Sequence, residues 1–334
     1  MNTQTPHLDM EVIFVCDPFE DDEDSQADCF TKHGDRPEKI SFELILRGLT
    51  EAVSHVTYYK TLPSLIDNLK NHQNSVVFPY WFGELSRNRH SLVPAICESY
   101  NIPYVGADAF TKVVCNDKHL SKLICRDAGL KTPRGFVITC SDELSLLDNC
   151  SFPIVLKPLC QGSSLGISEQ NLVYDPTSGR AVAEKISRTL GWPIICEEFV
   201  MGREVSLCMI GKHGSPPEIR AISWAIDGDQ GYLDERLFTY ALKYLNGCTF
   251  TPVPMEHILT DRLRISCEKL FRLLDKVEII RIDGRITSNG LTVIELSPDL
   301  DLRPDGELAV AFSEISYPKL LRRLILNTLE RIRT

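Results

Sequence analysis

The most constraining feature of this sequence is a short apolar run that ends in a lysine and leads into a loop rich in glycine and serine. The run occupies residues 154–156 and is bounded by prolines, which predicts a buried strand. Lys157 follows it, and because an unpaired charge is costly to bury, its ammonium must reach water or an anion. Residues 162–166 begin and end with glycine and contain two serines, so their backbone N–H groups could surround phosphate oxygens. Taken alone, the stretch is explained more simply as a strand end and an ordinary turn.

Length and charge limit the classes of protein to consider. A chain of 334 residues is longer than one hydrophobic core usually supports, which predicts two or three domains. Its hydrophobic fraction of 43% and charged fraction of 25% are those of an ordinary globular protein. The net charge of −10, without any block of Lys and Arg, argues against nucleic-acid binding but leaves room for a nucleotide.

The cysteines and the hydropathy pattern indicate a reducing compartment. The 12 cysteines occur singly, mostly in apolar or periodic segments, and no CxxC pair is present, so a disulfide framework or a zinc site has little support. No signal-peptide pattern opens the sequence, and no apolar run is long enough to cross a bilayer. We therefore expect a cytoplasmic protein with no membrane partner.

Strands and helices alternate in the first part of the chain, which favours an open, mostly parallel sheet that ends near Gly106. The expected strands are residues 10–16, 56–59, 75–80 and 104–105, and the expected helices are 38–53, 62–69 and 92–100. The acidic residues 17–36 are predicted to form a surface loop.

The remainder reads as a compact α+β lobe followed by a larger lobe. The expected strands are 136–138, 154–157, 168–173, 194–199, 204–210, 221–226, 279–286 and 291–296. The expected helices are 117–128, 142–147, 179–190, 259–274 and 317–331, with a loop at 227–244.

Paired acids suggest two sites. Glu197 and Glu198 end a strand and Glu204 follows a short linker, an arrangement that suits a nucleotide-binding hinge, although solvated acids at a strand end are as plausible. Asp283 and Glu295 lie on two strands joined by an Asn-Gly turn, a strong hairpin signal. On one face they would repel each other unless a cation such as magnesium, or neighbouring arginines, offset their charge.

Three further residues are candidates for a functional role. Lys118 begins a helix, where its charge opposes the helix dipole unless an anion is near. Lys243 and Tyr244 end the long loop and could cover a site as it closes. The alternative for all three is an ordinary surface position.

Taken together, these motifs resemble the D-alanine–D-alanine ligase branch of the ATP-grasp superfamily. In order along the chain they read NDK, FPIVLKP, QGSSLG, EEFVMGRE, KY, RID and VIELSP, preceded by IPYVGAD. The resemblance covers nearly the whole chain. It implies an ATP-grasp fold of the α/β and α+β classes. The expected parts are an N-terminal parallel-sheet domain (1–106), a central lobe (107–200) and a C-terminal lobe with a metal site (201–334). The two lobes would clamp ATP between them.

The resemblance also implies roles for individual residues. For the nucleotide these are Lys118 and Lys157 on the phosphates, the loop Gly162, Ser163, Ser164 and Gly166 over them, Glu197, Glu198 and Val200 at the adenine, and Glu204 at the ribose. For catalysis they are Lys243 at the γ-phosphate, Tyr244 in the lid and Arg281 at a tetrahedral intermediate. For Mg²⁺ (or Mn²⁺) they are Asp283 and Glu295, with Ser297 or Asp299 in doubt.

The substrate-facing residues depart from the family pattern. Ser297 stands where the family has an Asn ligand, and Asp299, which replaces a glycine, or Asp301 could supply the missing oxygen. Residues 301–305 replace a serine-rich stretch, and residues 17–24 and 81–84 replace N-terminal substrate motifs.

We therefore expect an ATP-dependent carboxylate–amine ligase that joins small amino-acid-like substrates through an acyl phosphate, on a pair other than two D-alanines. D-Alanine–D-alanine ligase itself and a catalytically impaired nucleotide-binding protein stay open as alternatives. Small-molecule partners and a homodimer are further expectations from the resemblance.

Overall fold

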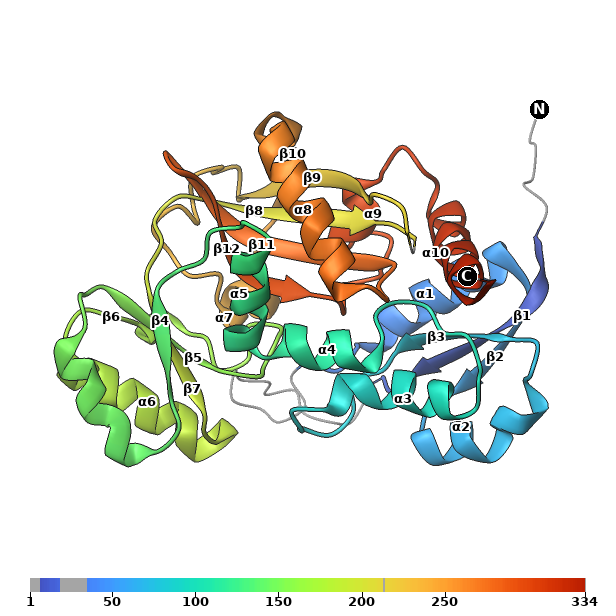
Figure 1. Cartoon of the computed structure of the whole chain (residues 1–334), viewed down its shortest axis with the longest axis horizontal. Helices are drawn as coiled ribbons and strands as arrows, with labels where there is room; N and C mark the ends of the chain where they lie inside the picture. The colour runs from blue at the N-terminus through green and yellow to red at the C-terminus, as the bar shows by residue number, and fades with distance from the viewer. Residues whose placement is uncertain (1–6, 19–34, 213, 334) are drawn as a thin grey trace.

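The protein is known from a computed structural model that describes residues 7–18, 35–212 and 214–333. Its described strands form three separate sheets of three, four and five strands. Figure 1 shows the four-stranded sheet at one end, the three-stranded sheet at the other, and the five-stranded sheet between them.

The first sheet is parallel, as the alternating pattern predicts. Its order is β2-β1-β3, with β1 (Leu8–Cys16), β2 (Val53–Tyr59) and β3 (Val76–Tyr80). Residues 12–16 of β1 are fully buried because helices cover both faces of the sheet. The helices of this part are α1 (Lys39–Ala52), α2 (Leu62–Asn68), α3 (Leu92–Ser99) and the short 3₁₀ helices η1 (Leu69–Asn71) and η2 (Arg89–Ser91).

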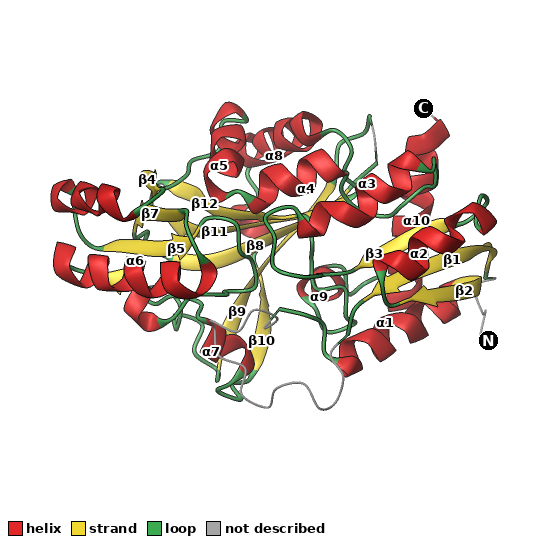
Figure 2. Cartoon of the chain, turned by 90° about the horizontal axis from the view of Figure 1, so that it is seen from below, coloured by secondary structure: helices red, strands yellow, loops and turns green. Residues whose placement is uncertain are grey.

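The second sheet is antiparallel and carries the lysine strand. Its order is β4-β7-β5-β6, with β4 (Gly135–Ile138), β5 (Ile154–Pro158), β6 (Leu172–Val173) and β7 (Ile194–Glu198). Helix α6 (Pro176–Leu190) packs against it, as Figure 2 shows. Two predictions were wrong in type: residues 141–149 form a 3₁₀ helix (η3, Ser141–Asn149), and most of the predicted strand 168–173 is a turn with η4 (Glu169–Asn171).

The third sheet is antiparallel with the order β10-β9-β8-β11-β12. Its strands are β8 (Arg203–Ile210), β9 (Glu218–Ile226), β10 (Phe250–Pro254), β11 (Ile279–Thr287) and β12 (Gly290–Ser297). The other helices are α4 (Ala109–Asn116), α5 (Lys118–Asp127), α7 (Tyr240–Tyr244), η5 (Glu256–Ile258), α8 (Asp261–Leu274), α9 (Glu307–Ala311) and α10 (Tyr317–Arg333).

Two segments connect parts that are distant in sequence. Helices α4, α5 and α8 share one hydrophobic core with the five-stranded sheet. Helix α10, at the end of the chain, packs on α1 and completes the core of the first sheet, as Figure 1 shows. The division into residues 1–106, 107–200 and 201–334 stays a prediction.

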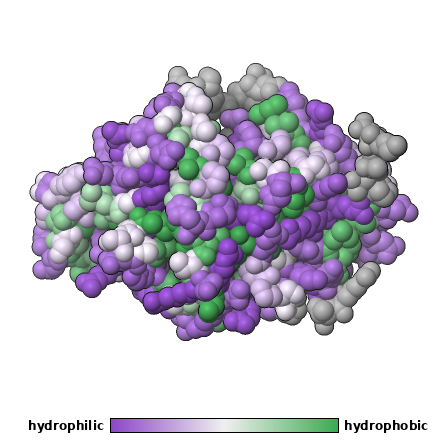
Figure 3. All heavy atoms as spheres, turned by 90° about the horizontal axis from the view of Figure 1, so that it is seen from above, coloured by the Kyte–Doolittle hydropathy of each residue, from purple (hydrophilic) through white to green (hydrophobic). Residues whose placement is uncertain are grey.

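No described helix is long and apolar enough to cross a membrane. On the face shown in Figure 3, hydrophilic residues predominate and hydrophobic ones form scattered patches.

Candidate active site

One large cleft brings the predicted site residues together. Its volume is 1320 Å³, and residues from all three sheets line it. Every residue predicted for nucleotide, metal or catalysis lines this cleft except Gly166, the buried last residue of the 162–166 loop.

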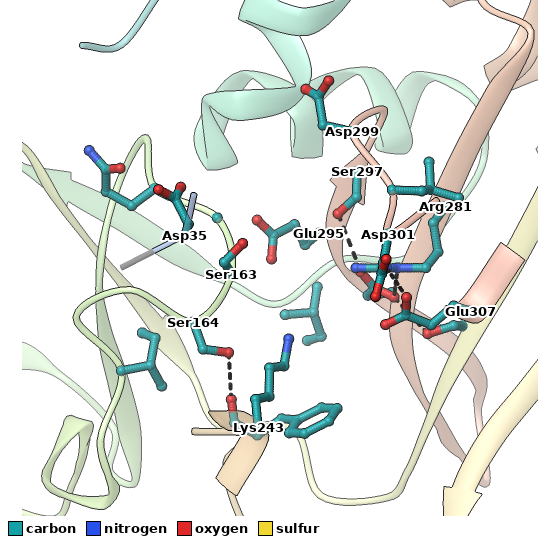
Figure 4. Close-up of a pocket in the computed structure, with 18 of the residues that line it drawn as sticks. Asp35, Ser163, Ser164, Lys243, Arg281, Glu295, Ser297, Asp299, Asp301 and Glu307 are labelled. Carbon is teal, nitrogen blue, oxygen red and sulfur yellow. Dashed lines mark hydrogen bonds and ion pairs between the residues drawn. The ribbon is translucent and has the colours of Figure 1, made fainter. Parts of the chain in front are cut away.

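The loop after β5 has an unusual backbone, but not at both predicted positions. Gly166 has a φ of +73°, whereas the positive angles before it belong to Ser163 (+53°) and Ser164 (+58°) rather than to Gly162. A Cβ at Gly166 would lie 2.7 Å from side-chain atoms of Pro158 and Leu190, so this position requires glycine. Ser164 Oγ donates a 2.8 Å hydrogen bond to the Phe238 carbonyl, which ties the loop to the segment before α7, as Figure 4 shows.

Glu197 is buried between two lysines. Its carboxylate lies 3.2 Å from Lys157 Nζ and 2.7 Å from Lys122 Nζ. Burial raises the pKa of Glu197, but the ammonium groups of Lys157 and then Lys122 outweigh it, so the pKa lies below its ordinary value. Sequence reasoning missed Lys122, although it lies one helical turn after Lys118 and so on the same face of α5.

Lys118, the first residue of α5, forms an ion pair with Glu295. Asp117 caps α5 by accepting from the N–H groups of His119 and Leu120. Lys118 is 4% exposed, and its Nζ lies 3.0 Å from Glu295 Oε1 and donates to the Gln161 carbonyl. Burial raises the pKa of Glu295, and Lys118 more than reverses that effect. This ion pair joins α5, β12 and the loop after β5.

The predicted hairpin places its two acids opposite each other. Asp283 and Glu295 are direct cross-strand partners in β11 and β12, with a bulge immediately after them. Asp283 accepts from Ser206 Oγ at 2.7 Å and, at 3.4 Å, from Ser297 Oγ. Arg281 Nε also reaches Asp283, at 2.8 Å, so the alternative of an arginine partner holds for this acid.

This set of oxygens fits a hard divalent cation. Two carboxylates and a serine hydroxyl are ligands that Mg²⁺ takes, since it keeps waters and substrate phosphates as its other ligands. Among the described residues, no group of three or more His, Cys, Asp or Glu side chains could hold a metal ion, so water and phosphate oxygens would have to complete the site.

Asp299 is not brought together with Asp283 and Glu295. It forms an ion pair with Lys112 of α4, and its other oxygen lies 3.8 Å from His90 Nδ1. Figure 4 shows its carboxylate turned away from Glu295. Its role as a metal ligand stays a prediction that this placement does not favour, and sequence reasoning missed Lys112.

Two of the predicted hinge residues, Val200 and Glu204, contact Arg285. Arg285 Nη1 donates to the Val200 carbonyl at 3.0 Å, and its Nη2 lies 3.0 Å from Glu204 Oε2. Burial raises the pKa of Glu204 despite this partner. Glu198 is exposed and accepts from the N–H of Arg134.

Helix α7 forms the end of the predicted loop 227–244. Lys243 Nζ lies 4.5 Å from the centre of the Phe238 ring, a cation–π contact, and in Figure 4 it points toward Glu295. Tyr244 is half exposed and packs on Tyr240, with ring centres 4.7 Å apart.

A family model described as "D-ala D-ala ligase C-terminus" matches residues 137–298. The D-alanine–D-alanine ligase of Blochmanniella floridana is 28% identical over 77% of this chain and 72% of its own length. An uncharacterized protein, y4sG, of Sinorhizobium fredii is 26% identical over 75% of this chain and 74% of its own. The structure of D-alanine–D-alanine ligase from Bacillus anthracis complexed with ATP superposes with a TM-score of 0.69 at 18% identity, covering 97% of this chain and 99% of that one.

The chain resembles the D-alanine–D-alanine ligases in sequence and shares the fold of their solved structures. The expected ATP-grasp fold is confirmed, with a parallel sheet before two antiparallel ones. The cleft lies where the three sheets of this fold meet.

Proposed function

We propose that the protein is an ATP- and Mg²⁺-dependent carboxylate–amine ligase acting on small amino-acid-like substrates other than a pair of D-alanines. The observation that carries this proposal is the convergence of Lys118, Lys157, the 162–166 loop and the Asp283/Glu295 pair on one cleft. Mn²⁺ could replace Mg²⁺ because both take oxygen ligands.

The nucleotide half of the cleft suits a triphosphate. Lys118 and Lys157 would contact phosphate oxygens, and the 162–166 loop would cover the phosphates. Glu197 would hold Lys157 and Lys122 in place. The backbone near Glu198 and Val200 would hold adenine, and Glu204 the ribose.

The metal residues would be Asp283, Glu295 and Ser297. A bound divalent cation would neutralise charge on the phosphates that transfer. Lys118 would exchange Glu295 for a phosphate as ATP binds, since both partners already face the cleft.

The reaction would proceed in two displacements. A substrate carboxylate oxygen attacks the γ-phosphorus, the bond to the β,γ-bridging oxygen breaks, and ADP leaves. The neutral amine then attacks the acyl carbon, the carbon–oxygen bond to phosphate breaks, and the amine proton passes to solvent. Arg281 would offset the charge that develops on the acyl oxygen, and Lys243 would do so at the γ-phosphate.

The altered acceptor residues support a substrate pair other than two D-alanines. Asp299 is engaged with Lys112, and Asp301 with Arg303. D-Alanine–D-alanine ligase activity stays the second candidate, favoured by the curated relatives.

The purified full chain should release ADP and phosphate from ATP and Mg²⁺ only when both a carboxylate and an amine are present. A panel of amino acids and amines, with D-alanine alone as one arm, tests this requirement. Tight ATP binding without turnover on any pair would instead favour an impaired nucleotide-binding protein.

A further inference from the structure

We place the amine at the end of the cleft beyond β12, because residues 301–305 there replace the serine-rich stretch of the resembled family, and the charged side chains that the described residues bring to this end are in ion pairs. The segment 298–306 and the start of α9 form this end, beside Arg281 of β11. Figure 4 shows Arg281, Asp301 and Glu307 grouped there, across the cleft from the 162–166 loop.

Arg281 is shared by two carboxylates. Its Nε lies 2.8 Å from Asp283, and its Nη1 lies 3.2 Å from Glu307 Oε2. That oxygen is shielded from solvent and receives no hydrogen bond of good geometry from the described residues. If a metal ion binds Asp283, Arg281 still keeps its ion pair with Glu307.

The other described cations that line this end also face carboxylates. Arg303 holds Asp301 through two nitrogens, with Nε 2.9 Å and Nη2 2.7 Å from Oδ2, and lies 3.7 Å from Asp305. The remaining pairs are Lys112 with Asp299, and Arg36 with Glu84 and Asp17.

This pairing disfavours a substrate carboxylate. Such a group would have to displace Asp301 or Glu307 from its guanidinium, which leaves a partly buried anion without a partner. A substrate cation, in contrast, would be attracted without breaking a pair, because Arg281 and Arg303 each face two carboxylates and this end therefore keeps an excess of negative charge.

We propose that the amine substrate carries a second cationic group and no carboxylate, as a diamine or a guanidino-amine does. The proposal rests on the proposed ligase function and names the class of its second substrate. Asp301 and Glu307 are its specificity-determining residues.

The direct test compares acceptors that differ only in a carboxylate. The full chain, ATP and Mg²⁺ are mixed with each proteinogenic L-amino acid, D-alanine or D-serine as donor. The acceptor pairs are putrescine and ornithine, cadaverine and lysine, and agmatine and arginine. We expect kcat/KM for ADP release to be at least tenfold higher with the decarboxylated member. Equal or higher kcat/KM for the amino acids overturns the proposal while the ligase function stands. No turnover with any pair overturns both.

A variant separates specificity from structure. Glu307→Gln should lower the ratio of kcat/KM for cadaverine to that for lysine at least tenfold, because it removes a charge that only the dication uses. A purely structural effect would lower both values and leave the ratio unchanged, and that result contradicts the proposal. Glu184→Gln, which changes an exposed acid paired to Arg188 on α6, is the matched control and should leave the ratio unchanged.

Discussion

Glu197 is the residue on which the phosphate side of the cleft depends. Its side chain is 1% exposed, and two lysines share its carboxylate. A buried ion pair adds little net stability, but the removal of one partner leaves the others charged and without compensation. Glu197 therefore acts by holding the Lys157 and Lys122 side chains in place.

We predict that Glu197→Gln lowers the free energy of unfolding by about 3 kcal/mol, because Gln keeps the shape but removes the charge. Urea unfolding at pH 7 measures this change. Glu184→Gln, whose acid is paired on the surface, should change it by less than about 1 kcal/mol. Equal stabilities of the two variants would contradict this role for Glu197.

At the scale of elements, the loop between β5 and η4 is shaped by its own backbone. Gly166 has a positive φ and a Cβ there would collide with Pro158 and Leu190, whereas a Cβ at Gly162 would meet open space. The two glycines thus differ in the conformational freedom they require, although the sequence presents them as equivalent.

Gly166→Ala should weaken ATP binding at least tenfold, because the new methyl group must displace Pro158 or Leu190 and so moves the loop. Gly162→Ala is the matched control and should leave the backbone in place. Titration calorimetry with ATP and Mg²⁺ compares the two dissociation constants. Similar affinities for both variants would show that the loop does not grip phosphate.

The elements that the sequence predicts best are those with local signals. The Asn-Gly turn predicts the β11–β12 hairpin, and helix–strand alternation predicts the first parallel sheet. Strand β10 was missed because Pro252 and Pro254 lie within it, which is tolerated only because β10 is an edge strand. The site was predicted where motifs are contiguous. Pairs such as Arg281 with Glu307, or Lys112 with Asp299, depend on tertiary contacts that no local pattern carries.

At the scale of the whole molecule, Glu278 joins the C-terminal helix to the first part of the chain. Its Oε1 lies 2.9 Å from Arg331 of α10, and its Oε2 accepts from the Gly106 N–H at 2.9 Å. Burial raises the pKa of this acid to about 7 even though Arg331 opposes the shift. The folded protein therefore retains a proton that the unfolded chain, with an ordinary Glu pKa of about 4.3, has lost.

This proton links stability to pH. Between pH 5 and 7 the folded state binds more protons than the unfolded state, so the contribution of Glu278 to stability falls as pH rises, by up to about 1.4 kcal/mol per unit. Glu278→Gln does not titrate. We predict that the unfolding free energy of the wild type minus that of the variant decreases from pH 5 to pH 7. A pH-independent difference in urea unfolding would contradict the raised pKa.

If the ligase activates a carboxylate as an acyl phosphate, an oxygen atom passes from that carboxylate to the phosphate that is released. The full chain is supplied with ATP, Mg²⁺ and the acceptors putrescine and cadaverine. The donors are the proteinogenic L-amino acids, D-alanine and D-serine, all labelled with ¹⁸O in their carboxylates. Mass spectrometry then reads the phosphate that is released. We predict one ¹⁸O atom in each phosphate, because the carboxylate oxygen that attacked phosphorus leaves with it. Unlabelled phosphate, which arises when water attacks ATP, would contradict this prediction.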